Sequence, residues 1–235
     1  MAGQITGADA VLNALLSKEN IEMVLVDREK NTSEIRRLCQ EQNIPLEEGS
    51  TNDLWRMSAN GHADALALVG RSPFGDLEQV LKRGGTIWFF DGVTYSTNLG
   101  FAIRTAEVSG ANAVVLNVSK THEERRTIRR SSMRADRFIP VVYSTTDEIL
   151  EAVSETKIRL ITVEDTGTHE PWEEDLSGDV MLVVGAEKEG ISEQVLAAAD
   201  ACVVLPMDGF VPSYNLQVAV SVVALEALRQ RNLQT

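Results

Sequence analysis

Three polar segments in the C-terminal half of the chain carry residue types that an α/β core does not select for packing. They run from Asn98 to Ala106, from Gly185 to Ile191 and from Leu205 to Leu216. Each segment begins where a strand-like run of apolar residues ends. Because ligands of open α/β sheets bind outside the carboxyl ends of the strands, these positions predict a ligand-binding site.

The first segment places Arg104 among apolar neighbours on a helix that we predict from Leu99 to Ser109. A guanidinium is costly to bury there unless it is paired or meets a ligand, so Arg104 is a candidate for ligand contact. The alternative is a surface arginine on an amphipathic helix. Asn98 directly precedes the predicted helix and is either a functional amide or simply its N-cap.

The other two segments combine glycine or proline with polar side chains. Gly185 and Gly190 bracket a loop whose backbone can approach a ligand closely because glycine has no side chain. A lone glycine loop is a weak signal, and this one matches neither the dinucleotide nor the nucleotide triphosphate fingerprint. In the third segment Ser213 and Asn215 stand at the start of the last predicted helix, where either could be a cap.

Alternating strand and helix patterns fill residues 76–235 and must position these segments. Apolar runs predict strands at 86–91, 113–116, 138–143, 159–163, 180–184 and 201–205. The spacings Thr121–Glu124 and Thr145–Glu148 are typical of capping boxes that open helices, the first helix reaching about Met133. A final helix is predicted at 215–231. This alternation indicates an α/β fold with a parallel sheet covered on both faces.

Residues 1–72 form a separate predicted unit. Helical spacing at 10–16 and 33–43 alternates with apolar runs at 22–27 and 63–69. Glycine, proline and serine then accumulate between Gly70 and Gly75, which predicts a boundary between two domains, 1–72 and 76–235.

Composition limits the classes of function. The only cysteines, Cys39 and Cys202, are far apart in the sequence of 235 residues, which argues against a disulfide framework or a zinc cluster and fits a reducing cytoplasm. Three scattered histidines also argue against a metal site. The most apolar part of the C-terminal tail, Val218 to Leu225, is too short to span a membrane, so we expect a cytoplasmic protein.

The net charge of −13 argues by itself against nucleic-acid binding, but the charge is unevenly distributed. The arginine strip, residues 125–137, holds six arginines and one acid. If the helix persists, one face carries Arg126, Arg130, Arg134 and Arg137. Such a face could contact the phosphates of RNA. The alternative is a solvated face whose arginines pair with acids such as Glu123 and Glu124.

Taken together, the three segments closely resemble the three motifs of the SPOUT superfamily, and within it the TrmH-type (SpoU) RNA 2′-O-ribose methyltransferases. The family pattern appears here as Asn98-x-Gly with Arg104, as Gly185-x-Glu187-x-x-Gly190, and as Leu205-Pro-Met-x-Gly209 followed by Ser213-Tyr214-Asn215. Tyr214 departs from the usual leucine. The resemblance spans residues 76–235, and residues 1–72 more weakly resemble the family's ribosomal-protein-like RNA-binding domain.

The resemblance implies a parallel-sheet domain whose C-terminal segment forms a trefoil knot, which binds S-adenosylmethionine and works as a homodimer. It implies that one subunit's motif arginine reaches the partner's cofactor pocket. The catalytic group it implies is Arg104, Asn98, Glu187, Ser213 and Asn215. The cofactor contacts it implies are Gly185, Leu205, Met207 and Tyr214.

These features predict an RNA 2′-O-ribose methyltransferase that acts on ribosomal RNA and uses no metal. Transfer RNA is the alternative substrate. A non-catalytic RNA-binding or ribosome-assembly protein on the same fold is a second alternative, and it would bind the cofactor without turnover. An unrelated α/β enzyme of small molecules would suit the acidic charge, and it would bind neither RNA nor S-adenosylmethionine.

Overall fold

The computed structural model describes residues 3–61 and 63–234. The chain divides into two compact units, unit 1 (Met1–Phe74) and unit 2 (Gly75–Thr235). Within the described residues, no helix combines the length and the apolarity that crossing a membrane requires.

Unit 1 is a small α/β unit built on a mixed sheet of four strands in the order β1-β4-β2-β3. Strands β2 and β3 are parallel, whereas β4 runs antiparallel to both β1 and β2. Its core lies between the sheet and two helices, α1 and α2. The elements are β1 (Gly3–Thr6), α1 (Ala8–Leu16), β2 (Ile21–Asp27), α2 (Ser33–Glu41), β3 (Leu46–Gly49), α3 (Thr51–Met57) and β4 (Ala65–Val69).

Unit 2 contains six strands in the order β10-β8-β9-β5-β6-β7, and every neighbouring pair is parallel. The prediction of an α/β fold with a parallel sheet is therefore confirmed. The elements are α4 (Leu77–Arg83), β5 (Thr86–Asp91), α5 (Ser96–Val108), β6 (Ala113–Leu116), α6 (His122–Ser131), the 3-10 turn η1 (Ala135–Arg137), β7 (Val141–Tyr143), α7 (Thr146–Ser154), β8 (Arg159–Val163), β9 (Val180–Gly185), α8 (Glu193–Ala198), β10 (Ala201–Val203) and α9 (Leu216–Gln234).

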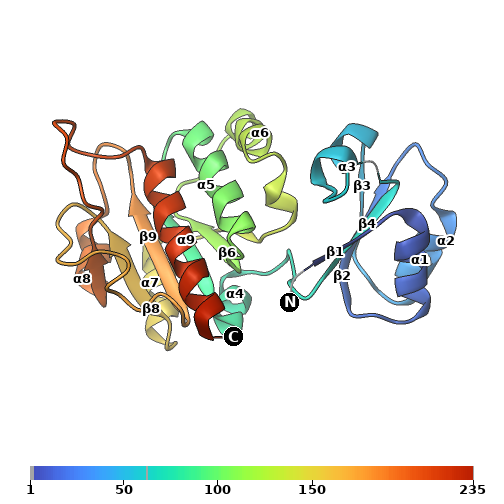
Figure 1. Cartoon of the computed structure of the whole chain (residues 1–235), viewed down its shortest axis with the longest axis horizontal. Coiled ribbons are helices and arrows are strands. Elements are labelled where there is room, and N and C mark those ends of the chain that lie inside the picture. Colours follow the sequence, from blue (N-terminus) through green and yellow to red (C-terminus); the bar gives the residue numbers. More distant parts are fainter. Residues whose placement is uncertain (1–2, 62, 235) are drawn as a thin grey trace. The chain divides into compact units, whose positions relative to one another are not determined.

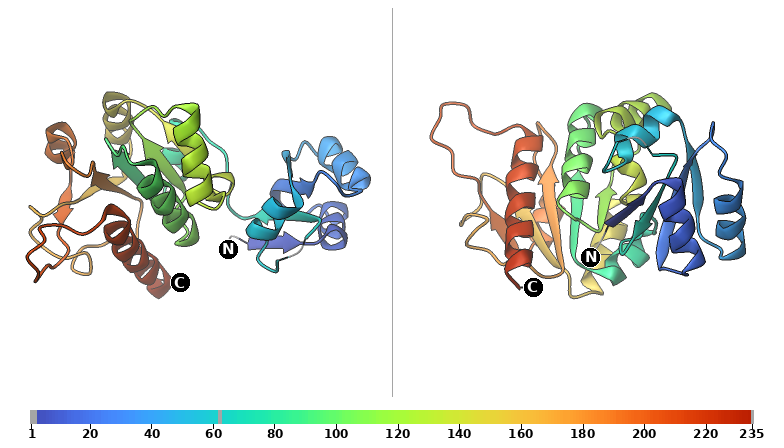
Figure 2. Two further views of the ribbon diagram at one scale, coloured as in Figure 1. Left: turned by 90° about the horizontal axis from the view of Figure 1, so that it is seen from above. Right: turned by 45° about the vertical axis from the view of Figure 1, so that its right-hand side comes forward.

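Helices cover both faces of this sheet, as the continuously apolar strands require. On the central strand β5, Trp88 and Phe90 pack with residues of α5 and α9 in one core cluster. Ile87 and Phe89 point to the opposite face, where α4, α7 and α8 close a second cluster. Figures 1 and 2 show α5 and α9 side by side on the first face.

The helix α5 packs closely against α6, and Gly100 makes this approach possible. A Cβ atom on Gly100 would lie 2.8 Å from the backbone oxygen of Ile128 and 2.9 Å from Cβ of Ser131. Real Cβ contacts essentially never fall below 3.0 Å. The glycine two residues after Asn98 therefore serves helix packing.

The segment 164–179, which connects β8 to β9, is tied to the C-terminal part of the chain. His169 pairs with Val203 of β10 in a parallel bridge. The side chain of Gln230 on α9 donates to the backbone oxygen of Glu174 at 3.0 Å and accepts from the N–H of Leu176 at 2.7 Å. The helix α9 is thus fastened along this long connection.

Most predicted helices and strands are confirmed, and they differ from the structure in the residues at which they begin or end. Both capping boxes are present, with Thr121 and Thr145 accepting from the backbone N–H three residues later. The helix α5 begins at Ser96 rather than at Leu99. The short strands β1 and β3 were not predicted, because four-residue strands with polar residues carry little periodicity.

The helix α6 ends at Ser131, two residues before the predicted end at Met133. Met133 and Arg134 both have positive φ, 52° and 69°. This left-handed conformation cannot continue an α-helix, so the chain turns into η1.

Candidate active site

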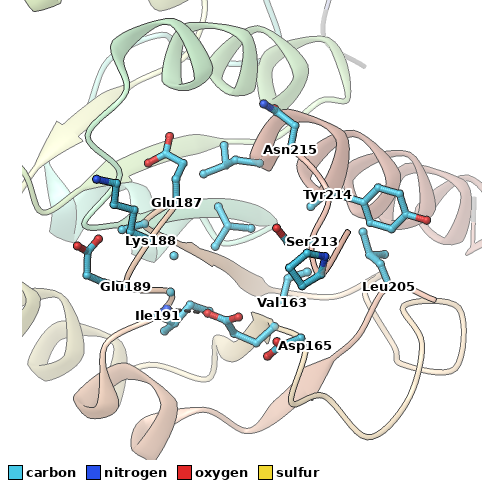
Figure 3. Close-up of a pocket in the computed structure, with 18 of the residues that line it drawn as sticks. Val163, Asp165, Glu187, Lys188, Glu189, Ile191, Leu205, Ser213, Tyr214 and Asn215 are labelled. Atoms are coloured by element: carbon cyan, nitrogen blue, oxygen red, sulfur yellow. Dashed lines mark hydrogen bonds between the residues drawn. The ribbon is translucent and has the colours of Figure 1, made fainter. Parts of the chain in front are cut away.

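A cavity of about 820 Å³ lies at the carboxyl ends of β8, β9 and β10. The segments that follow these three strands line it, together with the first turns of α5 and α9. In Figure 3, Glu187, Lys188 and Glu189 stand on one side and Leu205, Ser213 and Tyr214 on the other. The volume lies within the range of small-molecule and cofactor sites.

The cavity gathers residues that are far apart in the sequence. It is lined by all the predicted catalytic and cofactor-binding residues except Arg104, namely Asn98, Gly185, Glu187, Leu205, Met207, Ser213, Tyr214 and Asn215. Among the described residues, Arg104 lies outside this lining, on an exposed face of α5. One copy of the chain therefore holds eight of these nine residues in one place and directs the ninth to solvent.

Asn98 and Glu187 join two of the three segments. The Asn98 side-chain amide donates to Oε1 of Glu187 at 2.9 Å. Asn98 is the third residue of α5, whose N-cap position is Tyr95, so Asn98 is not the N-cap. The second carboxylate oxygen of Glu187 is buried and has no hydrogen-bond partner within residues 3–61 and 63–234. Because an unpaired buried carboxylate oxygen is costly, Glu187 is suited to meet a ligand or a cation.

The loop Gly185–Gly190 is held in a tight turn. Ala186 and Gly190 exchange two backbone hydrogen bonds of 3.0 Å. A Cβ on Gly185 would come closer than 3.0 Å to the backbone of Gly190 and Ile191, so only glycine fits. Directly after β8, the carboxylate of Glu164 accepts the N–H of Ile191 at 2.6 Å and fixes the far side of the loop.

A buried polar network anchors the chain just beyond this loop. Asp91, at the end of β5, is 3% exposed and accepts the Ser192 N–H at 2.7 Å. Its other oxygen accepts from the side-chain amide of Asn117, whose own oxygen accepts the Gly92 N–H at 2.7 Å. Ser192 occupies the N-cap position of α8 but makes no side-chain cap bond. The ends of β5 and β6 are thereby tied to the glycine loop.

In the third segment, the two candidate caps have different roles. The side-chain oxygen of Asn215 accepts the N–H of Gln217 at 2.9 Å, so Asn215 caps α9. Ser213 lines the cavity. The Tyr214 hydroxyl donates to the backbone oxygen of Pro206 at 3.0 Å and closes the irregular stretch between them.

The cavity lining is acidic. Glu164, Asp165, Glu187 and Glu189 contribute carboxylates, against the single ammonium of Lys188. This excess favours a ligand that carries positive charge. Glu164 and Asp165 were missed in the sequence, although the signal was present: both follow directly after the apolar run of β8.

The helix does not persist far enough for Arg126, Arg130, Arg134 and Arg137 to share one helical face, because α6 ends at Ser131. Arg126 and Arg130 are both exposed on α6, one turn apart. Arg134 lies in the left-handed turn, with its Nε 3.6 Å from Oδ1 of Asp136, and Arg137 belongs to η1.

Among the described residues, no ion pair joins Glu123 or Glu124 to Arg126 or Arg130, whereas Asp136 lies 3.6 Å from both Arg129 and Arg134. The carboxylate of Glu124 accepts from the backbone and hydroxyl of Thr121, and it lies 3.8 Å from Nζ of Lys120. The guanidinium of Arg125 stacks on the Tyr143 ring at 4.9 Å. Arg126 and Arg130 are thus exposed on the surface of α6, and their contact with phosphates stays a prediction.

Comparison with known proteins agrees with this geometry. Residues 85–225 match the SpoU rRNA Methylase family. The chain is 30% identical over 204 residues to the 23S rRNA (guanosine-2′-O-)-methyltransferase RlmB of Pseudomonas putida, covering 84% of this chain and 82% of RlmB.

Two solved structures share the fold. An RNA 2′-O ribose methyltransferase is 25% identical with a TM-score of 0.59, over 98% of this chain and 89% of that one. The SpoU methyltransferase AviRb from Streptomyces viridochromogenes, in complex with the cofactor AdoMet, is 21% identical with a TM-score of 0.61, over 99% of this chain and 91% of that one. The chain belongs to the SpoU rRNA methylase family.

Proposed function

We propose that this protein transfers a methyl group from S-adenosylmethionine to a ribose 2′-hydroxyl of ribosomal RNA. The observation that carries the proposal is the convergence of three distant motif segments on one cavity at the carboxyl ends of β8, β9 and β10. Membership of the SpoU family supports the activity and the cofactor. The likeness to RlmB, a 23S rRNA methyltransferase, favours ribosomal over transfer RNA.

The cavity fits the cofactor on several grounds. Its volume of about 820 Å³ admits a molecule of nucleoside size. Its acidic lining suits a sulfonium cation, and the bare glycine at 185 lets the backbone approach a ligand. Bound S-adenosylmethionine supplies an activated methyl group. In this proposal it is held by Gly185, Leu205, Met207 and Tyr214.

Arg104 then acts on the ribose. A guanidinium remains protonated in proteins, so Arg104 does not serve as the base for the 2′-hydroxyl proton. It instead clamps the adjacent phosphate or stabilises the negative charge that develops on the 2′-oxygen. The 2′-hydroxyl proton passes to water or to that phosphate. Asn98, Glu187, Ser213 and Asn215 orient Arg104 and the ribose through hydrogen bonds.

This division of roles requires a homodimer, because Arg104 lies outside the cavity of its own chain. The faces of α5 and α9 beside it carry exposed apolar side chains, which commonly mark an interaction surface. They are Phe101, Val108, Val218, Val222 and Leu225. In the proposed dimer these faces meet, and Arg104 of one copy reaches the cavity of the other.

A complementation experiment tests the dimer. Arg104→Ala and Glu187→Gln are each expected to transfer methyl far more slowly than the wild type, but a mixed dimer holds one site with both native residues. Co-refolding equal amounts should restore about a quarter of wild-type transfer, since half of the dimers are mixed and each has one intact site. No recovery, with mixed dimers demonstrated by differential tags, contradicts the shared site.

We further propose that the C-terminal segment forms a trefoil knot by passing through the connection 164–179. The ties from that connection to β10 and α9, through His169 and Gln230, support this path.

The proposed domains are 1–72 for RNA binding and 76–235 for methyl transfer. Arg126 and Arg130 are the proposed phosphate contacts, with Arg134 and Arg137 as secondary ones beyond the helix end.

The test is transfer of labelled methyl from S-adenosylmethionine to separated ribosomal and transfer RNA, followed by digestion to nucleosides. The expected result is label in ribosomal RNA alone, as 2′-O-methylribose. Label in transfer RNA would replace the substrate, and label on a base would overturn the reaction. Cofactor binding without transfer to either RNA would favour a non-catalytic RNA-binding or ribosome-assembly protein.

A further inference from the structure

Lys120 is a buried lysine outside the three motifs. Its side chain is 1% exposed, which is rare for lysine unless the ammonium has partners. It stands between the end of β6 and the capping residue Thr121 that opens α6. The partners of its ammonium therefore decide what the charge does at this position.

The contacts of Lys120 lead to the start of α5. Its Nζ donates to the backbone oxygen of Thr94 at 2.8 Å. Thr94 directly precedes Tyr95, the N-cap position of α5. The third residue of this helix is Asn98, whose amide binds Glu187. Lys120 therefore fixes the turn from which the first motif enters the cavity.

The charged groups around Lys120 also connect it to Glu187 of the second motif. Burial lowers the pKa of its ammonium, while the negative charges of Glu124 and Glu187 act in the opposite direction. The Glu124 side chain is 40% exposed, and its charge is screened by solvent. The buried Oε2 of Glu187 has no hydrogen-bond partner among the described residues. The positive charge of Lys120 thus acts on the motif carboxylate without a direct ion pair, and the two residues are joined through the start of α5 and Asn98.

We propose that Lys120 is a positioning residue for the methyl-transfer site. It holds the start of α5 through the Thr94 carbonyl and supplies the positive charge that balances Glu187, so that Asn98 and Glu187 keep their orientation. The effect on methyl transfer rests on the proposed function, whereas the energetic coupling between Lys120 and Glu187 does not.

The test is a double-mutant cycle on the full-length protein with Lys120→Met, Glu187→Gln and their combination. Lys120→Met keeps the volume of the side chain and removes its charge. We expect it to lower kcat about tenfold or more while the cofactor Kd changes less than about threefold. If Lys120 acts through Glu187, the double variant is no slower than Glu187→Gln alone. The same non-additivity should appear in urea unfolding.

The matched control is Glu124→Gln, which removes the other carboxylate near Lys120. Glutamine also serves in a capping box, so this variant should keep wild-type kcat. A loss equal to that of Lys120→Met would show that Lys120 merely fastens α6, and it would overturn the proposal. Wild-type kcat in Lys120→Met, or effects at 120 and 187 that multiply, would overturn it too.

The experiment stays decisive if Lys120→Met does not fold or if the wild-type protein is inactive. If Lys120→Met does not fold, Lys120→Arg and Lys120→Gln replace it, and the proposal requires faster transfer by the variant that keeps the cation. Equal rates contradict it. If the wild-type protein transfers no methyl to RNA, the proposed function fails. The urea measurement then still decides whether residues 120 and 187 are coupled.

Discussion

Replacing Gly185 by alanine should damage the cofactor site selectively, because the added Cβ meets backbone and not a movable side chain. It would approach the backbone carbon of Gly190 and the nitrogen of Ile191 to less than 3.0 Å. The loop must therefore open. Opening it strains the two 3.0 Å hydrogen bonds between Ala186 and Gly190.

The expected cost follows from these contacts. Losing two backbone hydrogen bonds costs about 0.5–1.5 kcal/mol each, and overpacking adds about 1–3 kcal/mol. If about 3 kcal/mol of this total is needed to restore the binding conformation, the cofactor Kd rises roughly 100-fold. A loss of about 3 kcal/mol in unfolding free energy would also lower Tm by about 6–12 °C.

Isothermal titration with S-adenosylmethionine and thermal unfolding measure the two effects. The matched control is Gly178→Ala, since a Cβ at Gly178 meets nothing within 4 Å. It should bind the cofactor like the wild type and change stability by less than about 0.5 kcal/mol. Wild-type cofactor affinity in Gly185→Ala would refute the assignment of this loop to the cofactor site.

Three further predictions concern the hydrogen bonds of Asp91, the proposed phosphate contacts on α6 and the buried thiol of Cys39. Asp91→Ala leaves the Ser192 N–H and the Asn117 amide without their buried acceptor, so urea unfolding should show a loss of about 2–4 kcal/mol; wild-type stability would contradict the network. Charge reversal of Arg126 or Arg130 should weaken RNA binding and reduce the slope of log K against log salt by about one each, and an unchanged slope would exclude phosphate contact. Burial raises the pKa of Cys39 to about 11, so at pH 8 iodoacetamide should modify Cys39 in urea but not in the native protein, as followed by mass spectrometry. Equal rates in both states would contradict its burial.

The sheet of unit 2 could be predicted because its strands are short, apolar and separated by helix signals. Thr86–Asp91 is buried at every position. A run that is buried throughout is typical of a strand in a parallel sheet that helices cover on both faces. The motif segments could also be placed, because each follows a strand of this kind. What the sequence could not supply was the order of the strands.

That order explains the residues that were missed. Glu164 and Asp165 reach the cavity because β8 lies beside β9 in the sheet, although some 20 residues separate them from the glycine loop. Lys120 is likewise important only because its loop folds against Thr94. Such long-range contacts leave no local pattern.

The arginines of the strip do not share one helical face for a different reason. Its spacing of four, four and three residues fits one helical face, but the fit assumes that the helix continues. The left-handed conformations of Met133 and Arg134 end it, and neither residue is a glycine or proline that would have signalled the break.

In the proposed mechanism, one cavity binds the cofactor while Arg104 acts on the RNA. The most direct test measures cofactor affinity and single-turnover methyl transfer side by side, in wild type and Arg104→Ala. The predicted result is a cofactor Kd within about threefold of wild type and a transfer rate reduced at least about 100-fold. Equal loss of both, or undiminished transfer by Arg104→Ala, would contradict the account.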